Sequence, residues 1–84
     1  MAKIVVYTTD SCRYCVAVKT LLQKRALQFS EVNLERDMDG RVALARRTGM
    51  MTFPQVLVDE KLLGGFEETR AAMDNGLLDE LLAA

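Results

Sequence analysis

Residues 3–22 read KIVVYTTDSCRYCVAVKTLL, and this stretch decides the fold. Its first part, residues 3–8, is a β-branched and aromatic run with little polar alternation, which predicts a strand buried on both faces. The polar residues 9–11 supply turn and N-cap chemistry, and apolar residues then recur at helical spacing as far as Leu22. The stretch therefore predicts a central strand, a short turn and a helix that begins at about Cys12.

The rest of the chain continues the alternation of strands and helices. Residues 28–34 alternate apolar and polar side chains, as a half-exposed strand does, and the short connections predict a right-handed βαβ unit with parallel strands. A helix, a tight antiparallel hairpin, a second helix and a final Leu-rich helix should follow. The predicted features are a helix over 37–47 with Val42 and Ala45 inward and Gly49 ending it, hairpin strands over 55–58 and 61–63, a helix over 66–73, and the last helix after Gly76.

Composition limits the class of protein. The chain has 84 residues, of which 50% are hydrophobic and 27% charged, so we expect one soluble domain over residues 1–84. The net charge is -1 and basic residues alternate with acidic ones, which argues against a nucleic-acid partner. No apolar run approaches the roughly 18 residues of a membrane span, and the apolar stretch within residues 1–7 is shorter than the apolar region expected of a secretion signal. We therefore expect a cytoplasmic monomer with no membrane partner.

The two cysteines of the chain, Cys12 and Cys15, lie at the predicted helix start, and the chain has no histidine. In a reducing cytosol such a pair is typical of catalysis or metal binding rather than of a structural disulfide. The first helical turn brings the two thiols together, while its free N–H groups and dipole stabilise a thiolate. We expect Cys12 to attack substrates and the less exposed Cys15 to resolve the mixed disulfide. Arg13 favours the thiolate, and Asp10 opposes it.

Two other interpretations of the cysteine pair stay open at this point. Both cysteines could be small buried apolar residues, although Ser11 and Arg13 mark an accessible turn. The pair could also supply half of a zinc or iron-sulfur shell, and a complete site would then need a second chain or an external thiol. We expect no metal bound by this chain alone.

Four motifs together resemble the glutaredoxins of the dithiol type. They are Tyr7-Thr8 at the end of the first strand, Cys12-Arg13-Tyr14-Cys15, Thr52-Phe53-Pro54, and Gly64-Gly65 before a helix. The resemblance covers nearly the whole chain. It implies a thioredoxin fold of the α/β class, with a four-stranded mixed sheet of order 2-1-3-4 flanked by helices, in the sequence βαβαββα with a short C-terminal helix.

The resemblance also implies a glutathione site. Phe53 would pair its backbone with the cysteinyl part of glutathione, and Pro54 would be cis and face the cysteines. Gly65 would allow close approach of the ligand, and the helix start after it would offer N–H groups to the γ-glutamyl carboxylate. The implied glutathione-binding residues are Arg13, Tyr14, Thr52, Phe53, Pro54, Gly65, Phe66 and Glu67.

Three positions depart from the pattern of the family. Arg13 stands where a proline is commonest, Thr9 where a lysine is frequent, and Met50 where a basic or amide residue usually precedes the Thr-x-Pro segment. The last two family residues help to hold the glycine carboxylate of glutathione. Arg13 or the Arg46-Arg47 pair could replace them, although the pair also fits a solvated helix face.

The resemblance implies an enzyme that uses glutathione to reduce protein disulfides or glutathione mixed disulfides through Cys12 and Cys15. Its partners would be glutathione and disulfide-containing proteins. One alternative with the same fold is a redoxin that supplies ribonucleotide reductase and is recharged by thioredoxin reductase. Another is a binding module in which Cys12 of two chains, with two glutathiones, holds an iron-sulfur cluster.

Overall fold

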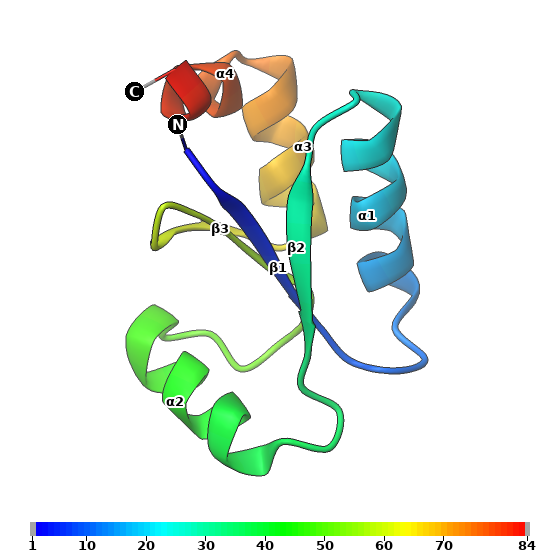
Figure 1. The fold of residues 1–84 in the computed structure, drawn as a ribbon, viewed down its shortest axis with the longest axis vertical. Helices are drawn as coiled ribbons and strands as arrows, with labels where there is room; N and C mark the ends of the chain where they lie inside the picture. Colours follow the sequence, from blue (N-terminus) through cyan, green and yellow to red (C-terminus); the bar gives the residue numbers. More distant parts are fainter. Residues whose placement is uncertain (1, 84) are drawn as a thin grey trace.

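The computed structural model describes residues 2–83, which form one mixed β-sheet and four helices (Figure 1). The strand order is β2-β1-β3-β4, which confirms the predicted thioredoxin fold. The observed helix and strand bounds lie within about two residues of those expected from the sequence. The elements are β1 (Ile4–Thr8), α1 (Arg13–Lys24), β2 (Phe29–Asn33), α2 (Met38–Thr48), β3 (Gln55–Val58), β4 (Lys61–Gly64), α3 (Phe66–Asp74) and α4 (Leu77–Ala83).

Strand β1 lies inside the sheet, parallel to β2 and antiparallel to β3. Ile4, Val6 and Thr8 on one of its faces are at most 2% exposed, whereas Val5 and Tyr7 on the other face are only half-buried. The expectation of full burial on both faces was therefore wrong for the second face. The main hydrophobic cluster covers the first face with side chains from α1, α3 and α4, and it contains none from α2, which lies apart from them in Figure 1.

Helix α2 buries a different residue from those expected. Leu44 is 2% exposed, whereas Val42, predicted to point inward, is 48% exposed, and Ala45 is half-buried. Residues two positions apart in an α-helix are separated by about 200° around its axis, so Val42 and Leu44 lie on nearly opposite faces of α2. Gly49 ends the helix in a left-handed conformation with a φ of 76°, as the sequence predicted.

The turn between β3 and β4 shows how a tertiary contact overrides turn preference. Asp59 and Glu60 have φ values of 48° and 72°, the left-handed pair that two-residue hairpins favour in Asn or Gly. The N–H of Asp59 donates to the carbonyl of Lys3 at 3.0 Å, and its Oδ1 accepts from the N–H of Lys3 at 2.8 Å. Anchoring to the start of β1 therefore holds a turn that the Asp-Glu pair alone does not favour.

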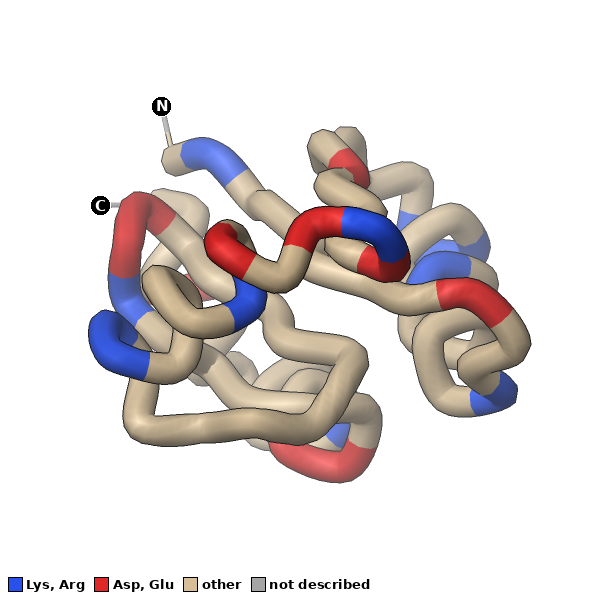
Figure 2. The backbone as a smooth tube through the Cα atoms, turned by 90° about the horizontal axis from the view of Figure 1, so that it is seen from below, with Lys and Arg blue, Asp and Glu red and all other residues tan. Residues whose placement is uncertain are grey.

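Charged residues of both signs are spread over the molecule. In Figure 2 the segments with Lys and Arg alternate with those carrying Asp and Glu rather than gathering by sign. Among residues 2–83, no helix is both long enough and apolar enough to span a membrane. The expectation that nucleic acid is not a partner stays a prediction.

Candidate active site

The two cysteines lie where the turn after β1 enters α1. Cys12 is the N-cap residue of α1, and its Sγ accepts a hydrogen bond from the N–H of Cys15 at 3.1 Å. The two cysteines form a disulfide, with their Cα atoms 5.1 Å apart. Cys15 is 2% exposed and Cys12 is half-buried, so the N-terminal cysteine is the more accessible one. A backbone N–H and the positive end of the helix dipole at Sγ stabilise a thiolate there.

A second loop reaches Cys12 from a distant part of the chain. The Phe53-Pro54 peptide bond is cis, and the carbonyl oxygen of Phe53 lies 3.8 Å from Cys12 Sγ. The side chain of Gln55, which is 1% exposed, donates from Nε2 to the carbonyls of Met50 and Thr52, at 3.0 Å each. Gln55 thus holds the loop that faces the cysteine. Sequence reasoning missed this residue, whose signal was a polar side chain at the start of a buried strand.

We call residues 50–54 the cis-proline loop. Together with the start of α3, this loop lines an open cavity of about 180 Å³. Seven of the eight residues that the resemblance assigned to glutathione line it. They are Tyr14, Thr52, Phe53, Pro54, Gly65, Phe66 and Glu67, and Met50 and Glu68 complete the lining. Arg13 lies outside this cavity, in a groove that both cysteines line.

Glycines and a glutamate shape the start of α3. Gly64 has a φ of 130°, and a Cβ on it would lie 2.6 Å from the Cβ of Glu68, so no other residue fits there. Glu68 accepts a hydrogen bond from the N–H of Gly65 at 2.7 Å, which the sequence did not reveal. Phe66 and Glu67 are the first two residues of α3, so their N–H groups have no acceptor within the helix. Both residues line the cavity.

Tyr14 partly covers the cavity from the side of α1. Its ring centroid lies 5.8 Å from that of Phe66, and the ring planes are inclined by 38°. Tyr14 is nevertheless 56% exposed, which leaves one side of its ring open to a ligand. The pair therefore joins the first turns of α1 and α3 beside the cysteines.

A polar groove is lined by both cysteines, and all of its charged side chains except Arg13 have a partner within the fold. We define it by residues 9–13 and by Cys15, Val16, Lys19, Glu31 and Asn33. The hydroxyl of Thr8 donates to Glu31 at 2.7 Å, and Lys19 lies 3.1 Å from both carboxylate oxygens. The hydrogen bond from Thr8 is the main cause that lowers the pKa of Glu31; burial opposes it and Lys19 reinforces it. Asn33 donates to Asp10 at 3.0 Å.

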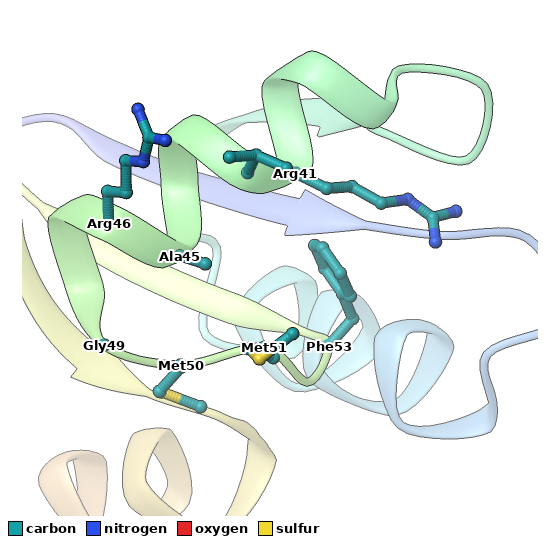
Figure 3. Close-up of a pocket in the computed structure, with 8 residues that line it drawn as sticks. Arg41, Ala45, Arg46, Gly49, Met50, Met51 and Phe53 are labelled. Atoms are coloured by element: carbon teal, nitrogen blue, oxygen red, sulfur yellow. The ribbon is translucent and has the colours of Figure 1, made fainter.

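A third hollow, of about 370 Å³, adjoins the cis-proline loop (Figure 3). We call it the α2 groove. It is lined by Arg41, Val42, Ala45 and Arg46 of α2 and by Gly49, Met50, Met51 and Phe53 of the following segment. Of these residues, Met50 and Phe53 also line the cavity beside Cys12.

Arg41 is the basic side chain nearest to the cis-proline loop in this groove. Its guanidinium carbon lies 5.8 Å from the ring centroid of Phe53. Its Nε and Nη2 donate to the carbonyls of Leu34 and Glu35, at 2.8 Å each. Sequence reasoning missed Arg41 and proposed Arg46 and Arg47 instead. Arg46 lines the groove, whereas Arg47 lies outside its lining and donates to Glu60 at 2.9 Å.

Over residues 2–83 there is no group of three or more His, Cys, Asp or Glu side chains placed to hold a metal ion. The geometry brings together a dithiol and an open cavity, an arrangement suited to exchange with a thiol-containing ligand.

The sequence is similar to known glutaredoxins over most of its length. The sequence profile described as Glutaredoxin matches residues 4–63. A glutaredoxin of Pseudomonas aeruginosa is 38% identical over 84 residues, which is the full length of both chains. The chain belongs to the glutaredoxin family. Glutaredoxin 3 of Escherichia coli is 33% identical over 82 residues, 98% of this chain and 99% of that protein.

Solved glutaredoxin structures share the fold. A buckwheat glutaredoxin in complex with glutathione matches with a TM-score of 0.86 and 28% identity, over 98% of this chain and 77% of that one. Oxidized glutaredoxin 2 of Chlamydomonas reinhardtii matches with a TM-score of 0.82 and 37% identity, over 98% and 80%. This glutaredoxin is a thiol-disulfide oxidoreductase with a Cys12/Cys15 dithiol motif.

Proposed function

We propose that this glutaredoxin reduces protein disulfides and glutathione mixed disulfides, with glutathione as its reductant. The observation that carries the proposal is the cavity beside Cys12, where the cis-proline loop, Tyr14 and the start of α3 converge. The buckwheat relative in complex with glutathione supports the same ligand class. We further propose that the protein works as a cytoplasmic monomer, in a compartment where thiols are kept reduced.

The cavity matches the chemistry of glutathione group by group. The backbone of Phe53 would pair with the cysteinyl unit and hold its sulfur near Cys12. The N–H groups of Phe66 and Glu67 would bind the γ-glutamyl carboxylate, and the Glu67 side chain would attract the neighbouring ammonium.

The glycine end of glutathione requires a positive charge. Thr9 and Met50 cannot supply one, but Arg41 lies over the ring of Phe53, beside the same loop. We therefore assign the glycine carboxylate to Arg41 rather than to Arg13, Arg46 or Arg47. Arg46 lies away from Phe53, toward the other end of the α2 groove (Figure 3). Arg13 lies in the polar groove, and Arg47 is directed to Glu60.

Each step of the reaction is a thiol-disulfide exchange, so the number of thiol groups and the number of disulfide bonds stay the same. The Cys12 thiolate attacks one sulfur of the substrate disulfide, and the other sulfur leaves as a thiolate that takes up a proton. Cys15 then attacks Cys12, which releases the second substrate thiol and forms the protein disulfide. Two glutathione molecules restore the dithiol in two such exchanges and leave as one glutathione disulfide. The oxidised state is the one present in the structure.

A recharging assay tests this proposal. The oxidised protein should be reduced by glutathione in the presence of glutathione reductase and NADPH, and should then reduce a small disulfide with steady turnover. Thioredoxin reductase with NADPH should recharge it poorly. Efficient recharging by thioredoxin reductase together with none by glutathione would overturn the assignment of glutathione and favour the ribonucleotide-reductase type of redoxin.

A further inference from the structure

The α2 groove has the properties of a binding surface. Two of its apolar side chains are open to solvent, since Met51 is 84% exposed and Val42 is 48% exposed. Figure 3 shows the side chains of Arg41 and Arg46 at opposite ends of the groove. None of the described residues that line it is acidic, and Arg46 forms no ion pair within residues 2–83. Exposed apolar surface bordered by unpaired charge is typical of interaction sites.

The α2 groove is continuous with the site of chemistry. Phe53 lines the groove on one side and the cavity beside Cys12 on the other, and its carbonyl oxygen lies 3.8 Å from Cys12 Sγ. An extended polypeptide advances about 3.3 Å per residue. A substrate chain that is bonded to Cys12 and passes Phe53 therefore enters the groove within a few residues of its own cysteine.

We propose that the α2 groove docks a segment of the protein substrate, close to its disulfide cysteine, that combines apolar and acidic side chains. The inference rests on the proposed reduction of protein disulfides. Apolar side chains of the segment pack on Val42 and Met51, and its carboxylates pair with the arginines.

Arg46 makes the larger contribution to the preference of the α2 groove for acidic over basic substrate segments. Arg41 already donates to two backbone carbonyls and lies 3.5 Å from the carboxylate of Glu35, so part of its charge is balanced. Arg46 lacks such a partner among the described residues and lies at the end of the groove far from Arg41. A small disulfide that reacts at Cys12 is too short to reach it.

The test measures one round of disulfide exchange, which does not depend on the natural reductant. Protein reduced beforehand and freed of reductant is mixed with a cyclic peptide disulfide; the Cys12/Cys15 dithiol becomes the disulfide and the peptide leaves as a dithiol. Two peptides are compared, identical except for a flank of Leu-Asp-Asp-Leu or Leu-Lys-Lys-Leu. Acid quenching and chromatography give the second-order rate constants for the wild type, for Arg46→Glu and for the matched control Arg47→Glu.

The wild type should react with the acidic peptide about fivefold faster than with the basic one, as two rim ion pairs of modest strength predict. Arg46→Glu should reverse that preference, while Arg47→Glu should keep it, because Arg47 lies on the same helix outside the groove lining. Both variants should reduce bis(2-hydroxyethyl) disulfide at the wild-type rate, which verifies that each is folded and active.

Equal rates with the two peptides, or equal effects of the two substitutions, would overturn the docking proposal while leaving the proposed function standing. Failure to reduce even the small disulfide would instead overturn the proposed function. Sedimentation at the assay concentration tests whether a second copy of the chain, rather than a substrate segment, occupies the α2 groove. A wild-type dimer that Arg46→Glu dissociates would assign the groove to a second copy of the chain and overturn the proposal.

Discussion

The polar groove, which Cys12 lines, and the α2 groove, which Phe53 connects to Cys12, differ in how their side chains are satisfied. In the polar groove, Glu31 is bound by Thr8 and Lys19, and Asp10 is bound by Asn33. In the α2 groove, Met51 is exposed and Arg46 has no ion-pair partner within residues 2–83. Side chains that bind one another stabilise the fold, whereas exposed apolar and charged groups remain available to a partner. The paired side chains of the first groove therefore support the site, with Arg13 as the one charged side chain there that has no partner among the described residues, and the second groove offers a surface for recognition.

The largest expected effect is at Cys12, which lines the polar groove and contacts Phe53 of the α2 groove. Cys12→Ser should lower turnover with any disulfide by on the order of a thousandfold or more, because the remaining thiol, that of Cys15, is only 2% exposed. Cys15→Ser should retain reduction of glutathione mixed disulfides, since glutathione can resolve the intermediate in its place. Steady-state rates with both substrate types check this. Full activity of Cys12→Ser would refute the assigned roles.

A smaller effect should follow from removing the support of the cis-proline loop. Gln55→Leu deletes the hydrogen bonds to the carbonyls of Met50 and Thr52 and leaves both without that donor. The free energy of unfolding should fall by about 1–3 kcal/mol. Amide exchange should speed up in segment 49–53 but not in segment 9–13, because only the former depends on Gln55. Equal loss of protection in both segments would mean that the cis-proline loop and the polar groove are not independent of each other.

The polar groove should contribute modestly to stability, in a pH-dependent way. Glu31→Gln should lower the free energy of unfolding by about 0.2–1 kcal/mol at pH 7, as for a solvent-accessible ion pair. The pKa of Glu31 is lowered in the folded state, so its stabilisation is present above the unfolded pKa and is lost as pH falls through the folded value. Denaturant titrations of both proteins should therefore converge under acidic conditions. A constant difference down to pH 2 would contradict this assignment.

The smallest effect on stability is expected in the α2 groove. Met51→Ser removes a side chain that is already 84% exposed, so the free energy of unfolding should change by less than about 0.5 kcal/mol. Reduction of the acidic, apolar peptide should nevertheless slow, while reduction of a small disulfide should not. A loss of stability comparable to that of Gln55→Leu would show that Met51 is a packing residue and would remove the contrast between the grooves.

Much of the fold could be predicted because its signals are local. The β-branched run before Cys12, the helical spacing after it and Gly49 at the end of α2 each act over a few residues, and each predicted its element correctly, although the expected burial of the strand on both faces was wrong. The cis peptide bond at Pro54 was also expected, although from the resemblance to glutaredoxins rather than from local signals. The inward face of α2 was misjudged at Val42, because which stripe of a helix is buried depends on the elements packed against it.

The residues that sequence reasoning missed all act through hydrogen bonds between their side chains and backbone groups three to seven positions away. Gln55 holds a loop through backbone carbonyls, Glu68 caps the helix on which it stands, and Arg41 reaches back to the carbonyls after β2. Backbone carbonyls and N–H groups are present at nearly every position, so the side-chain pattern alone did not mark these partners. Their roles became visible only when the chain was folded.

The sequence by itself determined the order of strands and helices and a dithiol at a helix start, since these follow from propensities and spacing within single segments. The tertiary structure decided what faces that dithiol. Cys12 meets the carbonyl of Phe53 across a separation of 41 residues, and the start of β1 holds the hairpin turn across 56. Contacts of this kind depend on how the layers pack, so the cavity, the polar groove and the α2 groove exist only in the folded protein.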